Sequence, residues 1–352
     1  MRSDRRRWLV AAVGGLVTAT LGVATARGQG AATSDATVPA TAAAETGPRN
    51  VLAEIASLTY QPRERVEGSL RLAGSATLQQ AASLWSQGFT AIHPAVSCEI
   101  ESGGSNAGWK ALTDGRADVA LLSRPLEDAE RAAWEKESGR RLVVVAVAFD
   151  QLVWIVNVAN PVSALPWTPA TGILRPEGDA AGTVATHWDR INGDAGWKDT
   201  AIRVHGRDLA SGTRWHLDRL LTGASAYHPD VQEHRTEAEL AEAVAADRGG
   251  LGLVSQKHGH WPGVKALPLT IPAGAAPLVD AVVGSQRTPD SRPLFVAFGA
   301  PKDGGPTGTL REFLAYVLSY SGQLDAAKDG FQPLSRGELH AQRELVEGLA
   351  AR

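Results

Sequence analysis

The sequence predicts an α/β protein with a mainly parallel sheet. From residue 69 onward, short apolar runs typical of strands alternate with longer segments whose apolar residues recur at helical spacing. Two adjacent runs, residues 141–149 and 150–157, are almost continuously apolar, which is typical of buried strands. Polar clusters of Ser, Thr and Gly follow several predicted strands, at the sheet edge where open α/β proteins bind ligands.

The elements of the first half follow from this alternation. Residues 76–93 form an amphipathic pattern with Trp85 and Phe89 on the apolar side, and residues 127–139 form a polar helix that ends at Gly139. The expected strands are 69–74, 95–102, 117–123, 141–149 and 150–157, and the expected helices are 76–93, 105–115 and 127–139.

The second half begins with an irregular region, residues 160–206, that is rich in Pro, Gly and Trp. A polar loop at residues 207–213 then separates a strand from a helix. The expected strands are 201–206, 249–255 and 292–300, and the expected helices are 214–223, 237–247 and 308–330, the last with a break near Ser321–Gly322.

Composition limits the function classes. The chain has 352 residues, of which 43% are hydrophobic and 21% charged, so it is long enough for two globular domains. The net charge of -3 offers no basic field for nucleic acid. The single cysteine, Cys98, lies in an apolar run and is expected to be a core residue, with no disulfide framework.

The N-terminus is typical of an exported protein. Residues 1–26 have a basic head, an apolar run and the small triplet Ala24-Thr25-Ala26, which is the pattern of a cleaved signal peptide. The arginines before Trp8-Leu9 resemble a twin-arginine signal, and the choice between twin-arginine and general export stays open. An uncleaved membrane anchor is disfavoured by the glycines and threonines in the run. We expect a soluble periplasmic protein whose residues 27–67 form a linker and N-terminal extension.

Four polar clusters lie at the carboxyl ends of predicted strands, and three of them directly precede a helix. A helix N-terminus offers free N–H groups and the positive end of the helix dipole, so an anion is the expected guest. Any one cluster alone is more typical of a simple helix cap, and the prediction depends on their convergence. The clusters are Gly74-Ser75-Ala76-Thr77, Ser102-Gly103-Gly104-Ser105, Ser123-Arg124-Pro125, and Arg207 with Ser211-Gly212-Thr213.

Catalytic and metal-binding patterns are weaker. The loop that begins at Gly103 has Ala107 where a nucleophile elbow needs a glycine, and neither a phosphate-loop motif nor a dinucleotide-binding motif occurs. His258 and His260 lack a second ligand cluster, so we expect no metal. His205 and His216 flank the fourth cluster without an obvious nucleophile beside them, and we interpret them as structural. The sequence therefore predicts neither an enzyme nor a cofactor.

Eight segments together resemble the phosphate-binding proteins of high-affinity phosphate ABC transporters, within the periplasmic solute-binding superfamily. The likeness extends over about residues 68–335. The segments are LAGSATL, ESGGSNAGWKAL, GRADVALLSRPLEDAE, VAFDQLVWIVNVANPV, IRVHGRDLASGTRWHL, RPLFVAF, FLAYVLSYSGQ and DGFQPLS.

The resemblance implies a type II two-lobe fold with the ligand in a cleft between the lobes. Each lobe is expected to be a mainly parallel sheet flanked by helices, and two crossover strands, residues 149–157 and 291–298, are expected to form the hinge. Residues 68–150 and 286–345 would build lobe 1, residues 151–285 lobe 2, and residues 346–352 a tail.

The resemblance also implies a function and its residues. A monomeric receptor would capture inorganic phosphate and deliver it to an ABC permease in the inner membrane. By position in the motifs, the oxyanion-binding residues are Ser75, Thr77, Ser105, Ser123, Arg207, Ser211, Gly212 and Thr213.

Three departures from the family pattern leave the ligand open. Arg124 stands where phosphate specialists often carry an Asp that accepts the phosphate proton, and it is expected either to contact the anion or to point out of the cleft. Ala76 replaces a common polar residue, and residues 162–200 depart from the usual pattern. A receptor for another oxyanion, such as sulfate or a phosphonate, therefore stays open. So do a phosphoester hydrolase and a cell-envelope module that has this fold but no transport role.

Overall fold

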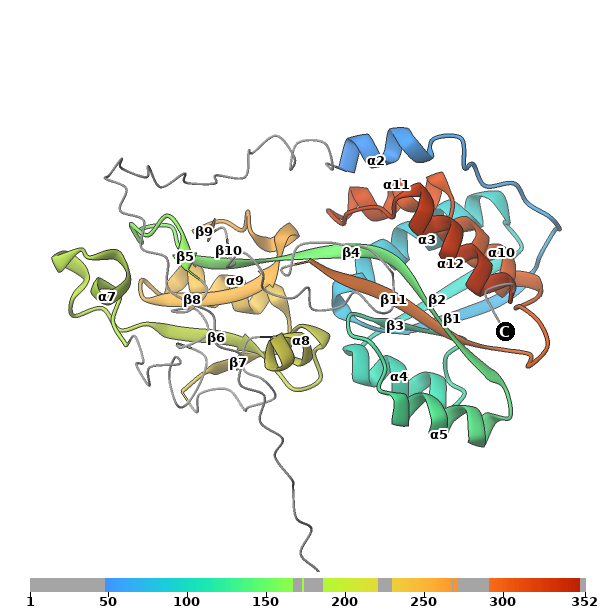
Figure 1. Ribbon diagram of the computed structural model, residues 1–352, viewed down its shortest axis with the longest axis horizontal. Coiled ribbons are helices and arrows are strands. Elements are labelled where there is room, and N and C mark those ends of the chain that lie inside the picture. The colour runs from blue at the N-terminus through green and yellow to red at the C-terminus, as the bar shows by residue number, and fades with distance from the viewer. Residues whose placement is uncertain are drawn as a thin grey trace, which may run out of the picture. The chain divides into compact units, whose positions relative to one another are not determined.

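The computed structural model describes residues 48–166, 173, 186–220, 230–267, 269–270 and 291–348 (Figure 1). All of them belong to one compact unit. The predicted signal peptide lies outside the described residues. Within the predicted extension, a short helix, α2 (Pro48–Ile55), precedes the first strand.

Lobe 1, as we use the term, is built on five strands in the order β2-β1-β3-β11-β4. These are β1 (Gly68–Gly74), β2 (Val96–Ser102), β3 (Val119–Leu122), β11 (Ser291–Ala300) and the first part of β4 (Arg141–Asn157). Strand β1 pairs in parallel with β2 and β3, whereas β11 pairs antiparallel with β3 and β4. The predicted parallel sheet is therefore a mixed sheet, because the chain returns through β11 in the opposite direction.

Helices cover both faces of the lobe 1 sheet. In Figure 1, α3, α10, α11 and α12 lie on one side of the strands, and α4 and α5 lie on the other. Their bounds are α3 (Gln79–Ile92, after the 3-10 turn Ala76–Leu78), α4 (Ser105–Thr113), α5 (Asp128–Ser138), α10 (Gly308–Val317), α11 (Tyr320–Lys328) and α12 (Arg336–Glu347).

The break in the long C-terminal helical pattern lies at Leu318–Ser319, slightly before the predicted Ser321–Gly322. Ser319 begins α11 as its N-cap, and its side chain accepts a hydrogen bond from the Gly322 amide. Gly322 itself packs against the end of α10, where a Cβ would lie 2.4 Å from the Tyr316 carbonyl oxygen. The glycine was therefore the visible signal, and the serine cap decides where the second helix begins.

Strand β4 joins the two lobes. The sequence shows two apolar runs here, and the structure makes them one strand of 17 residues. Residues 141–151 pair with β11 in lobe 1, and residues 152–157 pair with β8 and β9 in lobe 2. Strand β11 begins at Ser291, opposite Gln151, so both expected crossover segments meet at this boundary.

Lobe 2 contains the second part of β4, followed in the sheet order by β8, β6 and β7, with β9 also paired to β4. Strand β6 pairs in parallel with β7 and β8. The element bounds are β5 (Leu165–Pro166), α7 (Asp189–Asn192), β6 (Arg203–Arg207), α8 (Gly212–Leu220), β7 (Gln232–His234), α9 (Glu237–Ala246), β8 (Gly250–Ser255), β9 (Val264–Leu267) and β10 (Leu269–Thr270), with 3-10 turns at Ala195–Trp197 and Gln256–His258.

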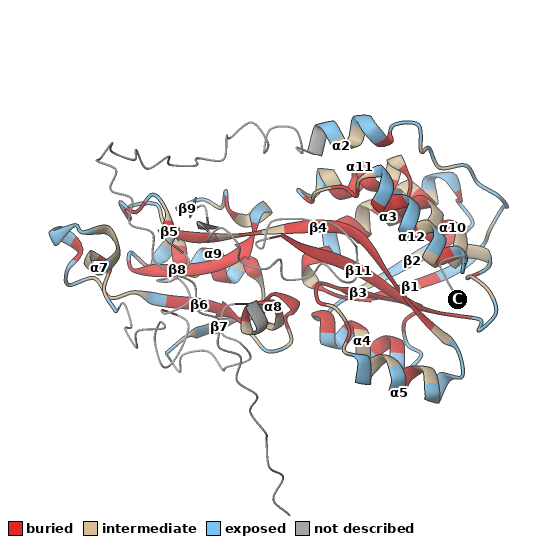
Figure 2. Cartoon of the chain, in the orientation of Figure 1, coloured by how far each residue is buried: buried red, intermediate tan, exposed pale blue. Residues whose placement is uncertain are grey.

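The strands carry the cores of both lobes, as Figure 2 shows by their burial. The lobe 1 core includes Trp85, Phe89 and Phe298, all fully buried, and half-buried Cys98 packs at its edge. In lobe 2, the neighbouring residues Trp154 and Ile155 of β4 enter two different clusters, as expected of side chains that alternate across a sheet. No helix in the described part of the chain is long and apolar enough to cross a membrane.

Candidate oxyanion site

Three serine hydroxyl groups meet at the carboxyl ends of the lobe 1 strands, and we call Ser75, Ser105 and Ser123 the serine trio. Ser75 Oγ donates to Ser123 Oγ at 2.9 Å, and the hydroxyl oxygens of Ser105 and Ser123 lie 3.1 Å apart. The Ser123 amide also donates to Ser105 Oγ at 3.0 Å. All three side chains are buried. Three loops that the sequence predicted to converge therefore do so.

The fourth cluster reaches the trio from lobe 2. A Cβ on Gly212 would lie 2.2 Å from Ser123 Oγ and 2.7 Å from Ser105 Oγ, so only a glycine permits this approach. Gly212 is the first residue of α8. The serine trio thus faces the N-terminus of a helix, where unpaired N–H groups and the helix dipole favour an anion.

The glycine pair before Ser105 has a structural role. The amides of Gly103 and Gly104 donate to the Gly74 carbonyl at 3.0 and 2.9 Å, so these N–H groups are already engaged. Gly104 has φ +88°, and a Cβ there would lie 2.6 Å from the Ala210 carbonyl oxygen of lobe 2. The pair makes a tight turn that lets the lobes approach closely.

Arg292, which sequence reasoning did not select, links the two threonines of the predicted site. Its Nη1 donates to Thr213 Oγ1 of lobe 2 at 2.8 Å, and its Nη2 lies 3.5 Å from Thr77 Oγ1 of lobe 1. The side chain is fully buried at the start of β11. A charged residue next to a proline at the start of an apolar run was the available signal.

Arg292 is held by a carboxylate from the neighbouring crossover strand. Asp150 lies directly opposite it in the β4–β11 register, and Asp150 Oδ2 accepts from Nε at 3.0 Å and from Nη2 at 2.7 Å. The other carboxylate oxygen accepts from Ser255 Oγ at 2.5 Å. Burial raises the pKa of Asp150, and the charge of Arg292 opposes that rise.

A second buried carboxylate, Glu237 at the start of α9, completes the network. It accepts from Thr213 Oγ1 at 2.9 Å, and its other oxygen lies 3.1 Å from His258 Nδ1. Burial alone would raise the pKa of Glu237, but the hydrogen bond with His258 and the charges of Arg292 and Arg207 hold it below its usual range. Glu237 therefore stays ionised.

Arg207 lines the same cavity as Thr77. Its Nη2 donates to the Arg235 carbonyl at 2.7 Å, and its Nη1 is 3.8 Å from Glu237 Oε1. Both Arg207 and Thr77 line an open cavity of about 560 Å³ between the lobes. The remaining predicted residue, Ser211, accepts a hydrogen bond from the Thr213 amide at 3.1 Å.

Side-chain charges in this network balance. Arg207 and Arg292 stand against Asp150 and Glu237, and all four side chains are buried. An anion bound here would therefore be stabilised mainly by hydroxyl and amide dipoles at contact distance. The chemistry of the site is that of oriented hydrogen-bond donors.

The structure does not bring Arg124 into this site. Its Nη1 and Nη2 each donate to an oxygen of Glu130 at 2.8 Å, and its Nε donates to Asn106 Oδ1 at 3.0 Å. A further bond runs from Nη1 to the Pro125 carbonyl at 2.9 Å. All three nitrogens are thus engaged away from the serine trio. Of the two expectations for Arg124, these hydrogen bonds favour the one in which it does not contact the anion.

The histidines near the fourth cluster are buried. Burial and the nearby charge of Arg292 lower the pKa of His216 to about 3. His205 lies between His234 and Asp247 within lobe 2. Of the two loop histidines, His258 contacts Glu237 and His260 is exposed. Within the described residues, no group of three or more His, Cys, Asp or Glu side chains could hold a metal ion.

Comparison with known families agrees with this geometry. Residues 27–321 match the family model of the PBP superfamily domain. The chain belongs to the PBP superfamily. The predicted α/β type II fold is thereby confirmed, with the parallel sheet corrected to a mixed one.

The chain is also similar to two named relatives over about three quarters of its length. It is 28% identical over 281 residues to the phosphate-binding protein PstS of Pseudomonas aeruginosa, covering 78% of this chain and 86% of the relative. Protein SphX of Synechococcus elongatus is 26% identical over 265 residues, with 74% and 76% covered.

Among solved structures, a putative phosphate ABC transporter substrate-binding protein from Clostridium perfringens, with bound phosphate, has a TM-score of 0.60 at 24% identity, covering 76% of this chain and all of that one. An ABC-type phosphate transport receptor from Vibrio cholerae has a TM-score of 0.56 at 23% identity, covering 74% and 98%. At these identities, the structures support the fold.

Proposed function

We propose that this chain is a periplasmic solute-binding protein that captures inorganic phosphate between its lobes and delivers it to an ABC permease. The observation that carries the proposal is the convergence of the serine trio with Gly212 at the N-terminus of α8. The names of the relatives, a phosphate-binding protein among them, support the same ligand.

The arrangement suits a tetrahedral oxyanion with several acceptor oxygens. Hydroxyl groups rotate to donate, so the serine trio and Thr77 supply donors from lobe 1, whereas the Thr213 hydroxyl of lobe 2 already donates to Glu237. Arg207 adds a charge-assisted donor from the cavity wall. Because donors come from both lobes, the bound anion would stabilise the closed cleft.

The site favours binding over catalysis. In the described part of the chain, the hydroxyl of Ser105 has its hydrogen bonds with Ser123, and neither a histidine nor a carboxylate is among its partners. A serine nucleophile needs such a base within hydrogen-bond reach. We therefore propose a non-enzymatic receptor that works as a monomer in the periplasm.

One observation favours another oxyanion as the second candidate. Arg124 occupies the position of the acidic proton acceptor and is bound to Glu130, so that position accepts no proton from a ligand. A site without such an acceptor discriminates less between hydrogen phosphate and fully deprotonated anions such as sulfate. Glu237, which contacts Thr213, is a carboxylate already saturated by its own donors.

Calorimetric titration of phosphate, sulfate, arsenate and methylphosphonate into anion-stripped protein tests the proposal. Phosphate is expected to bind most tightly, and Arg207→Ala is expected to abolish binding because it removes the charge-assisted donor. Arg203→Ala, at the other end of β6, is the matched control and is expected to bind normally, since Arg203 pairs with Asp247 at the surface. Sulfate bound as tightly as phosphate would overturn the ligand assignment, and normal binding by Arg207→Ala would overturn the residue assignment.

A further inference from the structure

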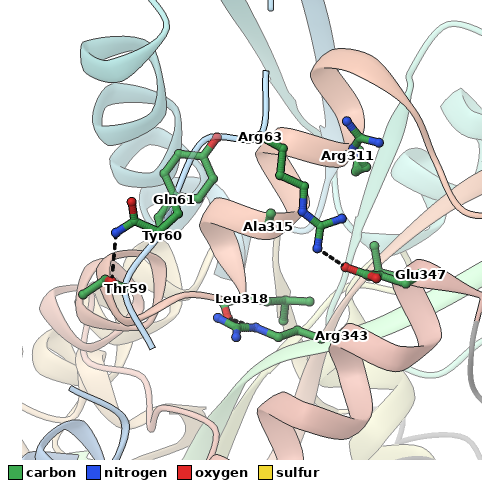
Figure 3. A pocket seen from close by; sticks show the side chains of 10 residues that line it. Thr59, Tyr60, Gln61, Arg63, Arg311, Ala315, Leu318, Arg343 and Glu347 are labelled. Carbon is green, nitrogen blue, oxygen red and sulfur yellow. Dashed lines mark hydrogen bonds and ion pairs between the residues drawn. The ribbon is translucent and has the colours of Figure 1, made fainter. Parts of the chain in front are cut away.

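A second cavity lies on lobe 1, and none of its lining residues belongs to the predicted oxyanion site (Figure 3). Its walls come from three segments that are distant in sequence: residues 59–63 before β1, the end of α10, and α12. It measures about 700 Å³, counting the space that opens to solvent. A cavity built from such distant segments depends on the complete fold of the lobe.

Guanidinium groups gather in this cavity. Three arginines line it, Arg63, Arg311 and Arg343, against one lining carboxylate, Glu347. Arg63 forms an ion pair with Glu347, and Arg311 forms one at 2.6 Å with Glu64 nearby. Glu312 lies 3.7 Å from Arg311 as well, so Glu347, Glu64 and Glu312 match the three guanidinium groups in number, although only Glu347 lines the cavity.

Arg343 is the guanidinium without an ionic partner. Its Nε donates to the Leu318 carbonyl at 2.9 Å, and within the described residues no carboxylate lies at ion-pair distance from its Nη1 or Nη2. The side chain is half-buried, and burial lowers its pKa, whereas the charge of Glu347 raises it and that of Arg63 lowers it. Its two terminal nitrogens make no ion pair that would compensate for their lost hydration, so an incoming anion would be favoured.

The free end of Arg343 defines the shape of that anion. With Nε engaged, the two terminal nitrogens remain, and this end of a guanidinium forms two parallel hydrogen bonds with a planar carboxylate. Figure 3 shows the group below the Arg63–Glu347 pair and beside Leu318. The headgroup best matched to this geometry is a carboxylate.

Apolar side chains define the rest of the ligand. Leu318 and Val346, both buried, line the cavity together with half-buried Ala315. The ring of Tyr60 forms part of the wall, and its hydroxyl is fixed by Glu312 at 2.7 Å. Leu318 and Val346 have little surface left to cover, so a hydrocarbon body would gain from burial mainly against the partly exposed Ala315 and the Tyr60 ring.

We propose that this cavity is a binding site for a small organic carboxylate, whose headgroup pairs with Arg343 and whose hydrocarbon body packs mainly on Ala315 and the Tyr60 ring. The site is separate from the oxyanion cleft and does not depend on the function proposed for it. The chain would then bind two chemically different anions.

Hexanoate is the probe, titrated calorimetrically into the full chain beside 1-hexanol and inorganic phosphate. We expect one hexanoate site and no measurable binding of hexanol. Arg343→Gln is expected to weaken hexanoate binding at least about tenfold, as for the loss of a charged hydrogen-bonded pair. Arg65→Gln is the matched control, since Arg65 is exposed in the same segment and does not line the cavity. Ala315→Leu, which fills the floor without changing charge, is a second variant expected to weaken binding.

Several results would overturn the proposal. The proposed site would be wrong if hexanoate did not bind, or if it bound Arg343→Gln and Ala315→Leu as tightly as the wild type. If hexanol bound as tightly as hexanoate, the carboxylate group would not contribute to recognition. Loss of hexanoate binding in Arg207→Ala places the ligand in the cleft, and displacement of hexanoate by phosphate shows a general anion site.

Discussion

Replacing Arg292 by methionine tests whether the crossover strands are held by a buried ion pair. Methionine keeps much of the volume but leaves Asp150, which is 1% exposed, without its cation. Removing one partner of a buried pair costs about 3–5 kcal/mol. That is a large part of the roughly 5–15 kcal/mol typical of a folded domain.

Urea denaturation followed by tryptophan fluorescence at pH 7 measures this loss for Arg292→Met. The companion variant Arg292→Met/Asp150→Asn removes both charges and keeps an acceptor for Ser255. We expect the double variant to be more stable than the single one by about 1 kcal/mol or more, because no uncompensated charge remains.

The pH dependence of Arg292→Met provides a second check. Burial already raises the folded-state pKa of Asp150 above its unfolded value, and removing the arginine that opposes this rise increases it further. The carboxyl group then costs nothing at pH values below the unfolded pKa and destabilises the fold as the pH rises through the folded pKa. The variant should therefore be least impaired in acid. A loss below about 1 kcal/mol at pH 7, or a double variant no more stable than the single one, would refute the reasoning.

Three further predictions concern single residues. Gly212→Ala should abolish anion binding in calorimetry, because its Cβ would lie 2.2 Å from Ser123 Oγ and keep lobe 2 away from the serine trio; binding as in the wild type would contradict this. His216 has a pKa of about 3 in the fold, below its unfolded value, so its contribution to stability is present above about pH 6.5 and declines as the pH falls. Between pH 7 and pH 5, the free energy of unfolding of His216→Leu should therefore fall by about 2 kcal/mol less than that of the wild type in urea denaturation. Equal dependence of the two free energies on pH would refute this. Lys257 of lobe 2 donates to the Thr77 carbonyl of lobe 1 at 2.8 Å, so Lys257→Met should weaken anion binding and open the cleft in small-angle scattering; an unchanged scattering profile would speak against a link between the lobes.

Local signals in the sequence were enough for much of the fold and for the meeting of the serine trio. Each predicted strand of lobe 1 appears near its expected place because apolar runs and glycine boundaries are local features. The carboxyl ends of β1 and β3, which are parallel, lie at one sheet edge, so Ser75 and Ser123 come together without any long-range information. That the trio binds an oxyanion stays a prediction.

Other features depend on distant partners. Arg292 and Asp150 are separated by 142 positions, and only the antiparallel register of two crossover strands places them together. In the sequence, Glu237 is an acidic residue in the first turn of a helix, which is a common position for such a residue. Its burial depends on the contact between the start of α9 and Thr213 at the start of α8. Nothing local marks either group as part of the site.

The start of the last helix is marked in the sequence by a capping box. Ser335 and Glu338 form a capping box at the start of α12, and the spacing of the two residues is visible in the sequence. The segment was expected to include the beginning of a tail at residue 346, but α12 extends to Glu347. Its buried face packs on lobe 1, so this helix belongs to the core of the lobe.

The position of β11 has a consequence for synthesis of the protein. This strand inserts between β3 and β4, and all of its residues are buried, yet it is translated after the described strands of lobe 2. Until residue 300 has left the ribosome, β3 and β4 lack their shared neighbour and expose unpaired edges, which attract wrong partners. We therefore expect lobe 2 to form first on a nascent chain, and lobe 1 to close around its last strand only when synthesis is nearly complete. A chain that stops before β11 should depend on chaperones to stay in solution.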